Sequence, residues 1–253
     1  MIIELFGPPG VGKTTFACAL AARLRESGRT VKLVLSHRPM ELSADSLKDP
    51  VRHQNTAVVR RLLRPIAELL AMSSHLRAHS REVNTAAILM RILPSKDLVW
   101  SIRLRQYLWR LSRSWYHASA APHITLFDQG FVQAVCSLAL LGQAPDGQRV
   151  ALALDAIPRS DVLIRLDAPR EILKARLAER HRRQSRNERI FELDLKTNLE
   201  SAEVVDHLHD LLRKRGRSVI CINSIDRNSL REAVNSIERQ VTAMLSKDRG
   251  VKV

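Results

Sequence analysis

The sequence predicts an α/β protein built on a parallel sheet of about five strands, with helices on both faces of the sheet. Short apolar runs alternate along the chain with longer segments in which apolar residues recur every three or four positions. This alternation of strands and helices is typical of parallel sheets, where a helix joins each strand to the next. A length of 253 residues suits a single domain of this kind. We therefore expect residues 1–253 to form one domain.

The individual elements follow from the apolar patterns. Five runs have the composition of buried strands, namely residues 2–6, 30–36, 123–128, 161–167 and 218–223. The helix expected after the first strand carries Phe16, Ala19, Leu20 and Leu24 at helical spacing and stops at Gly28. Later helices are expected over residues 131–141, 169–183, 195–215 and 228–245, the last of them capped by Asn228 or Ser229.

A basic helical insertion is expected over about residues 40–120. Residues 55–118 are helix-like, with an apolar stripe from Val59 to Leu70 and a break at Pro94 and Ser95. Residues 51–120 hold 12 Lys and Arg against 3 Asp and Glu, a net of +9. These charges fit either a solvated face or a surface for an anionic molecule.

The first strand is followed by a glycine-rich octet that matches G-x-x-x-x-G-K-[ST]. It consists of Gly7, Pro8, Pro9, Gly10, Val11, Gly12, Lys13 and Thr14. Glycines allow the backbone to approach a phosphate closely, and successive N–H groups can then surround the anion. The N-terminus of the following helix adds partial positive charge. The octet therefore predicts a phosphate cradle.

Three side chains next to this cradle have expected roles. Lys13 should reach the β- and γ-phosphates of ATP, and we expect it to be largely exposed without a ligand. Thr14 is placed to ligate Mg²⁺ and Thr15 to contact the α-phosphate. ATP and Mg²⁺ are thus the expected ligands.

An acidic residue at the carboxyl end of the third strand is the strongest candidate for catalysis. Asp128 there can hold Mg²⁺ or accept a proton from an attacking hydroxyl. A turn aspartate at a strand end is the structural alternative. Glu41 and Asp167 are weaker candidates, and the sequence around Asp167 favours a turn and helix cap.

Arginines dominate the segment from Arg170 to Arg189, which holds 8 Lys and Arg against 3 Glu. Arg176 and Arg180 are four residues apart and so share a helical face. A segment of this kind can cover a triphosphate and neutralise the moving phosphoryl group. We expect a lid over about residues 176–192, with a solvated helix end as the alternative.

The order of these parts resembles the P-loop nucleoside and nucleotide kinases, most closely the thymidylate-kinase-like group. The resemblance is carried by the octet and by the motifs "SHRP", "DQGFVQA", "IRLDAPREILKARLAER" and "ICINSIDRNSLREAVNSI". It implies a P-loop NTPase-type sheet. It also implies that Arg38 and Phe131 lie near a phosphoryl acceptor. Gln129 stands where the family has an arginine, which leaves the acceptor open.

Three classes of function remain from the sequence. The favoured class is an ATP-dependent phosphotransferase acting on a nucleotide, a nucleoside or another small metabolite. The second is a P-loop ATPase or nucleotide-dependent regulatory protein. The third, suggested by a net charge of +15, is a nucleic-acid-binding protein. "NSID" lacks the lysine of the guanine-reading N-K-x-D motif, and a homodimer is left open.

Cysteine spacing and hydropathy bound the environment of the protein. Cys18, Cys136 and Cys221 share no close spacing and each sits in an apolar element, so we expect buried, reduced thiols. No apolar run approaches the roughly 20 residues that span a bilayer. The first residues lack the basic and apolar regions of a signal peptide. A cytoplasmic protein is therefore expected.

Overall fold

A computed structural model describes residues 1–36, 80–95, 98–142, 146–183, 195–223 and 225–250. It shows an α/β fold with five strands, β1 Ile2–Phe6, β2 Val31–Val34, β3 Ile124–Phe127, β4 Val162–Asp167 and β5 Ile220–Asn223. The described helices are α1 Lys13–Glu26, α3 Ser80–Ile92, α4 Leu98–Ser119, α5 Phe131–Leu141, α6 Gly147–Ala156, α7 Arg170–Arg183, α9 Leu195–Lys214 and α10 Arg227–Gly250.

The strands form one parallel sheet in the order β2-β3-β1-β4-β5. The central strand β1 is buried along its whole length. Because side chains alternate across a strand, Ile2 and Phe6 enter one core while Ile3 and Leu5 enter the other. The predicted parallel sheet with helices on both faces is confirmed.

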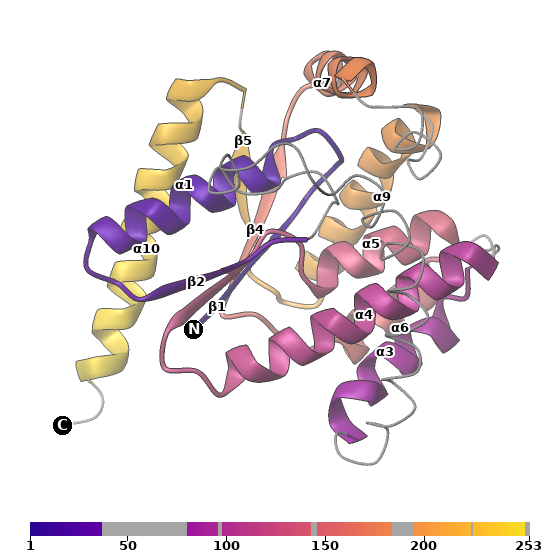
Figure 1. The fold of residues 1–253 in the computed structure, drawn as a ribbon, viewed down its shortest axis with the longest axis horizontal. Helices are drawn as coiled ribbons and strands as arrows, with labels where there is room; N and C mark the ends of the chain where they lie inside the picture. The colour runs from indigo at the N-terminus through magenta and orange to yellow at the C-terminus, as the bar shows by residue number, and fades with distance from the viewer. Residues whose placement is uncertain (37–79, 96–97, 143–145, 184–194, 224, 251–253) are drawn as a thin grey trace, which may run out of the picture.

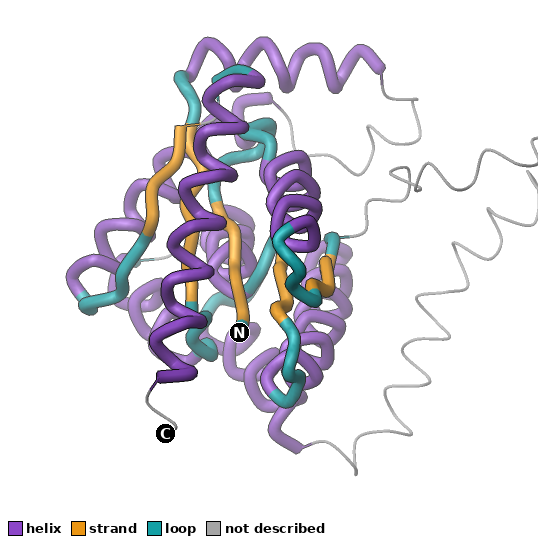
Figure 2. Tube along the Cα trace, turned by 90° about the vertical axis from the view of Figure 1, so that its left-hand side faces the viewer, coloured by secondary structure: helices purple, strands orange, loops and turns teal. Residues whose placement is uncertain are grey.

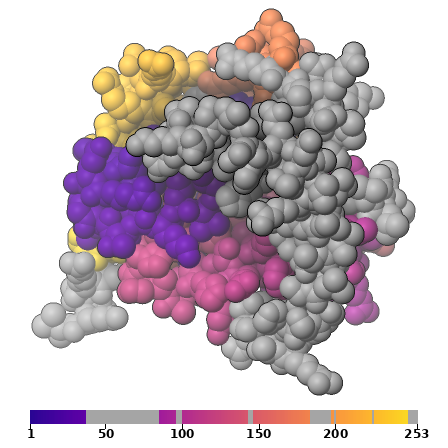
Figure 3. Space-filling model, in the orientation of Figure 1, coloured from indigo at the N-terminus to yellow at the C-terminus, as the bar shows by residue number. Residues whose placement is uncertain are grey.

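The two faces of the sheet are covered by different helices (Figures 1 and 2). α1 and α10 pack on one face, where their side chains share a core with β1, β3 and β4. α3, α4, α5, α6 and α9 form the other layer. In the space-filling view, α10 (yellow) lies beside the N-terminal segment (indigo) on the surface (Figure 3). α7 lies above the sheet at the top of Figure 1.

Between β2 and β3 the described chain is helical, as predicted for the insertion. α3 and α4 are separated at Pro94 and Ser95. The inner face of α4 contributes Leu108, Leu111 and Trp115 to the core, and the Trp115 ring stacks on Phe127 with centroids 5.0 Å apart. The predicted stripe from Val59 to Leu70 lies outside the described residues.

The structure contains one helix that the sequence did not predict, and one predicted helix cap is wrong. The unpredicted helix is α6, which Asp146 caps by accepting a hydrogen bond from the Arg149 N–H at 2.6 Å. The cap of α10 is Asp226, whose Oδ1 accepts from the Ser229 N–H at 2.8 Å. It is thus neither Asn228 nor Ser229, because an aspartate one position before the helix takes the role.

The predicted burial of the three cysteine thiols is confirmed only for Cys136. That thiol is buried in α5, and burial raises its pKa to about 12. Cys18 and Cys221 are exposed. Cys18 lies on the outward face of α1, and Cys221 lies on β5, an edge strand in which only Ile222 is buried. Within the described ranges, no helix is long and apolar enough to cross a membrane.

Candidate functional site

The glycine-rich octet forms a tight loop between β1 and α1. Gly7 has a φ of 151°, and a Cβ atom there would come within 2.3 Å of the Leu166 carbonyl oxygen. Gly12 has a φ of 100° and is the N-cap of α1. Residues with side chains rarely adopt such conformations. Glycine therefore lets the loop pass against β4 and turn into the helix.

The N-terminus of α1 faces this loop without a side-chain cap. Gly12 supplies no capping side chain, and the first turn of α1 contains no acidic residue. A helix N-terminus carries partial positive charge on its backbone N–H groups. The loop and the helix end together have the geometry of an anion-binding site.

Lys13, the first residue of α1, turns its ammonium back into the loop. Its Nζ donates hydrogen bonds to the carbonyl oxygens of Gly7 at 2.7 Å and Pro8 at 3.0 Å. Only 8% of the residue is exposed. The loop carbonyls solvate the charge in place of water, so the expectation of a largely exposed lysine is wrong.

Thr14 and Asp128, the two predicted metal ligands, lie in direct contact. The Thr14 hydroxyl donates to Asp128 Oδ2 at 2.9 Å. Asp128 is fully buried just after β3, and its Oδ1 accepts from the Ser36 N–H at 2.7 Å. The Ser36 hydroxyl donates to Oδ2 at 3.2 Å. The sheet thus brings the end of β3, the end of β2 and the start of α1 to one point.

The oxygen atoms that meet at this point fit Mg²⁺, which prefers hydroxyl and carboxylate oxygens as ligands and keeps several waters. Asp128 supplies the carboxylate, while Thr14 and Ser36 supply hydroxyls. Among the described residues, no group of three or more His, Cys, Asp or Glu side chains is arranged to hold a metal. Within the described ranges, the protein ligands of a magnesium ion would therefore be this carboxylate and the two hydroxyls, completed by water and nucleotide phosphates. Sequence reasoning missed Ser36.

The insertion brings a tyrosine to the neighbourhood of Asp128. The Tyr107 hydroxyl of α4 donates to the Gln129 carbonyl oxygen at 3.4 Å. Burial, and then the nearby carboxylates of Asp128 and Glu4, raise the pKa of Tyr107, so its hydroxyl stays protonated. A protonated hydroxyl this near the buried acid is a hydrogen-bond donor that the sequence pattern did not identify.

Phe131 lies at the start of α5 with 1% of its surface exposed. Its ring meets Trp115 edge to face, with centroids 5.2 Å apart. The structure therefore gives Phe131 a role in the core, and its predicted contact with an acceptor stays a prediction. Arg38, the other predicted acceptor residue, lies outside the described residues, as does Glu41.

Arg176 of α7 links two loops at the carboxyl edge of the sheet. Its Nη1 donates to the Val11 carbonyl oxygen of the octet at 3.0 Å, and its Nη2 donates to the Ile225 carbonyl oxygen at 2.8 Å. Ile225 lies between β5 and α10. The planar guanidinium, with donors pointing in two directions, can make this bridge.

The other charged residues of the expected lid are only partly described. Arg180 lies one turn after Arg176 and is half-buried. α7 ends at Arg183, as the sequence predicted for this helix. The rest of the segment to residue 192 lies outside the described residues.

Asp167 is held by an ion pair. Its Oδ2 accepts from Arg165 Nη2 at 2.7 Å, and its Oδ1 accepts from the Ala168 N–H at 2.8 Å. Arg165 Nη2 also contacts Asp206 of α9. The expectation that Asp167 caps a helix is therefore wrong, since α7 begins only at Arg170.

A family model supports the identity of the phosphate loop. Residues 1–90 match the model described as anion-transporting ATPase, ArsA ATPase, which belongs to the P-loop NTPases. The match contains the octet, and the structure places the octet between a buried parallel strand and a helix. The chain has a P-loop NTPase fold. The resemblance to the P-loop kinases is thus confirmed at the level of this superfamily, while the thymidylate-kinase-like group stays a prediction.

Comparison with solved structures adds a more distant likeness. The P-loop chain is similar to a deoxyadenosine kinase from M. mycoides with bound dCTP, at 12% sequence identity and a TM-score of 0.43. The similarity covers 96% of this chain and 100% of that chain. No curated protein sequence matches the chain.

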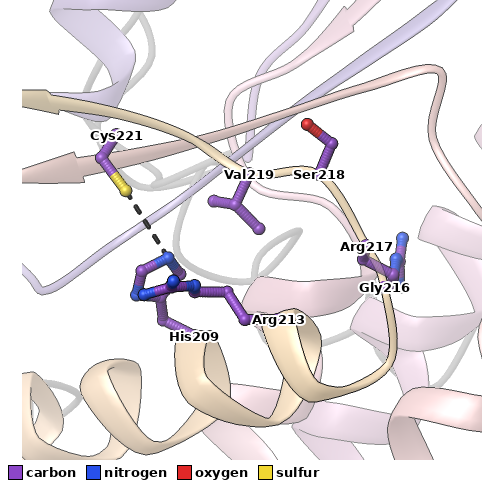
Figure 4. Close-up of a pocket in the computed structure, with 7 residues that line it drawn as sticks. All are labelled: His209, Arg213, Gly216, Arg217, Ser218, Val219 and Cys221. Carbon is purple, nitrogen blue, oxygen red and sulfur yellow. Dashed lines mark hydrogen bonds between the residues drawn. The ribbon is translucent and has the colours of Figure 1, made fainter.

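A separate pocket of about 400 Å³ lies where α9 leads into β5 (Figure 4). Its lining is basic and includes His209, Arg213 and Arg217, and Cys221 Sγ lies 3.6 Å from His209 Nε2. Burial lowers the pKa of His209, and the charges of Arg165 and Arg213 lower it further. The pocket contains none of the predicted site residues, so the candidate site is assigned from its chemistry.

Proposed function

We propose that the protein is an ATP-dependent phosphotransferase that moves the γ-phosphoryl group of ATP to a small acceptor. The observation that carries the proposal is the contact between Thr14 and the buried Asp128 beside the glycine-rich loop. In P-loop enzymes a hydroxyl and a carboxylate in these positions hold Mg²⁺ against the phosphates. A bound Mg²⁺ would neutralise charge on the phosphates.

The residues of the loop bind the donor nucleotide. Backbone N–H groups of residues 10–15, which include the N-terminus of α1, surround the phosphates, and the Lys13 ammonium exchanges its two loop carbonyls for phosphate oxygens. Thr15 contacts the α-phosphate. The ammonium is already desolvated, so less water is lost when the phosphate binds.

Asp128 either accepts the proton of the acceptor hydroxyl or orients the metal. Burial and the hydrogen bond from the Ser36 N–H fix the carboxylate in place, so the side chain does not have to change its conformation before reaction. The acceptor enters from the side of the insertion, where α4 brings Tyr107 to the Gln129 carbonyl. Arg38 and Phe131 belong to this side by resemblance.

Arg176 and Arg180 act from α7 over the same edge of the sheet. Arg176 already contacts the octet at Val11, which places this helix against the nucleotide loop. Arginine suits phosphoryl recognition because it donates two parallel hydrogen bonds. We assign residues 176–192 as the lid and residues 40–120 as the acceptor-side insertion of one domain spanning residues 1–253.

The second candidate is a P-loop ATPase without a small-molecule acceptor. The match of residues 1–90 to the anion-transporting ATPase model favours it, because that model describes ATPases and the match includes the octet. An ATPase requires only the loop, a metal site and an oriented water.

An acceptor screen separates the two candidates. Purified protein, ATP and Mg²⁺ are incubated with panels of nucleosides, nucleotides and sugars while ADP release is measured. A phosphotransferase releases ADP far faster with one chemical class than without any acceptor. Equal rates with every class, abolished in Lys13→Ala, would identify the ATPase.

A further inference from the structure

Two hydrogen bonds running in opposite directions tie β1 to the first turn of α5. The N–H of Val132 in α5 donates to Glu4 Oε1 of β1 at 2.5 Å. In return, the N–H of Gly7, which follows β1, donates to Gln133 Oε1 of α5 at 3.0 Å. All the participating groups are buried. We call these two bonds the β1–α5 clasp.

Glu4 destabilises the folded state at this position, because an ionisable side chain in the middle of a buried central strand loses its hydration. Burial raises the pKa of Glu4 to about 7, against the opposing effects of the Val132 N–H, Arg217 and Ser160. The backbone also makes room for it: a Cβ atom at Gly130 would lie 2.5 Å from Glu4 Oε1. A purely apolar core would need neither the carboxyl group nor the glycine.

The clasp joins the two halves of the candidate site. Gly7 opens the phosphate loop, and Asp128 lies between β3 and the start of α5. Val132 and Gln133 follow Asp128 by four and five residues, so a shift of the first turn of α5 moves Asp128 relative to the loop. At the spacing of this structure, the Thr14 hydroxyl donates to Asp128 Oδ2 at 2.9 Å.

We propose that Glu4 and Gln133 are positioning residues, which hold the phosphate loop and the Asp128-bearing turn in the register that nucleotide binding requires. The inference rests on the proposed nucleotide site. Gln133 fixes the first N–H of the loop, so later N–H groups of the loop surround the phosphates. Glu4 fixes α5, so the acceptor oxygen of Gln133 stays where Gly7 needs it.

The test uses variants that keep or remove each acceptor oxygen at nearly constant volume. Gln133→Met and Glu4→Met remove the acceptor, whereas Glu4→Gln keeps an Oε1 acceptor for the Val132 N–H. Ser137→Ala is the matched control, because it removes a hydrogen bond from the Ser137 hydroxyl to the Gln133 carbonyl that lies within α5 and outside the clasp. If Gln133→Met does not fold, Gln133→Asn withdraws the acceptor by one methylene instead.

Calorimetric ATP affinity and hydrogen exchange at the Gly7 amide are the readouts. A buried N–H without a partner costs enough to weaken binding by about 5- to 100-fold if the loop moves. We expect Gln133→Met and Glu4→Met to weaken ATP binding in this range and to speed Gly7 exchange. Glu4→Gln and Ser137→Ala should remain within about twofold of the parent protein.

Two results would overturn the inference. One is ATP affinity within about twofold of the parent in folded Gln133→Met and Glu4→Met. The other is a Glu4→Gln variant as impaired as Glu4→Met, which would show that the acceptor oxygen is irrelevant. Lys13→Ala separates this failure from failure of the proposed function: if ATP binding survives loss of Lys13, the nucleotide site itself is wrong.

Discussion

At the scale of single residues, Lys13 shows how the loop stabilises a positive charge before any phosphate arrives. Two carbonyl oxygens of the loop accept hydrogen bonds from Nζ at 2.7 and 3.0 Å. These carbonyls belong to Gly7 and Pro8, so the two hydrogen bonds from Lys13 also stabilise the conformation of the loop. Its side chain therefore has a local structural role besides the one proposed in binding.

Lys13→Met should remove tight ATP binding while the protein still folds. Methionine keeps most of the aliphatic stem but cannot donate to a phosphate. We expect ATP affinity to fall by at least about 100-fold, as for loss of a charged contact worth roughly 3 kcal/mol. Calorimetry gives the affinity and circular dichroism the melting curve. Normal melting with unchanged affinity would rule out the phosphate cradle.

Asp128→Asn should keep nucleotide binding and lower turnover by at least about 100-fold, the lower end for a lost general base. The amide oxygen can still accept from the Ser36 N–H, so the fold is kept. Turnover measured against Mg²⁺ concentration separates the roles: recovery at high Mg²⁺ indicates the metal role, and no recovery the base role. Turnover within a few-fold of the parent would show that Asp128 has neither.

Glu4 should make the stability of the protein fall as pH rises toward neutrality. Its folded pKa of about 7 lies above the usual glutamate pKa of 4.5, so the folded state binds the proton more tightly than the unfolded state. The stabilisation is complete below pH about 4.5 and is lost as pH rises to about 7. It is on the order of 3 kcal/mol, since each pKa unit is about 1.4 kcal/mol.

Glu4→Gln removes this titration. Between pH 5 and 8, the difference in unfolding free energy between the parent and Glu4→Gln should change by a large part of that amount, with the variant gaining at high pH. Urea unfolding at both pH values measures it. The same pH dependence in both proteins would contradict the raised pKa.

At the scale of elements, α7 is more than a basic helix end, because Arg176 connects it to the octet and to the loop before α10. Sequence spacing identified Arg176 and Arg180 as one face, but it gave no sign that backbone carbonyls would hold Arg176. Side chain–backbone contacts between residues 165 positions apart leave no local pattern in the sequence.

Arg176→Ala and Arg180→Ala should each lower kcat by roughly 10- to 1,000-fold, below the upper range for arginine fingers. In Arg180→Ala, the KM for ATP should change much less than kcat. Arg176→Ala should raise the KM for ATP more than Arg180→Ala does, because the Arg176 side chain also supports the loop at Val11. Steady-state kinetics tests both. If kcat is untouched while the salt dependence of nucleic-acid binding weakens by about one unit per arginine, the basic surface serves nucleic acid instead.

The strands, most helices and the phosphate loop were predictable because their signals are local. Apolar runs mark the strands, and the spacing of Leu108 and Leu111 marks α4. α6 had a signal that was missed, in Asp146 followed by Val150, Ala153 and Leu154 on one face. Glu4 could not be assigned, because its partner lies 128 residues away.

At the scale of the whole molecule, the fold explains why residues from distant parts of the chain meet. The order β2-β3-β1-β4-β5 places β3 beside β1, so Asp128 emerges next to the loop that begins at Gly7. β2 lies on the other side of β3, so Ser36 reaches the same carboxylate. A parallel sheet brings the carboxyl ends of its strands to one edge, and the candidate site forms there.

Transfer of label from ATP carrying a labelled γ-phosphoryl group tests the central claim most directly. The parent protein and Asp128→Asn are incubated with labelled ATP, Mg²⁺ and the acceptor class that most stimulates ADP release, and the products are separated. We predict that the parent places the label on the organic acceptor and that Asp128→Asn does so at least about 100-fold more slowly. Label found only in inorganic phosphate, whatever acceptor is offered, would contradict phosphoryl transfer and leave the protein an ATPase.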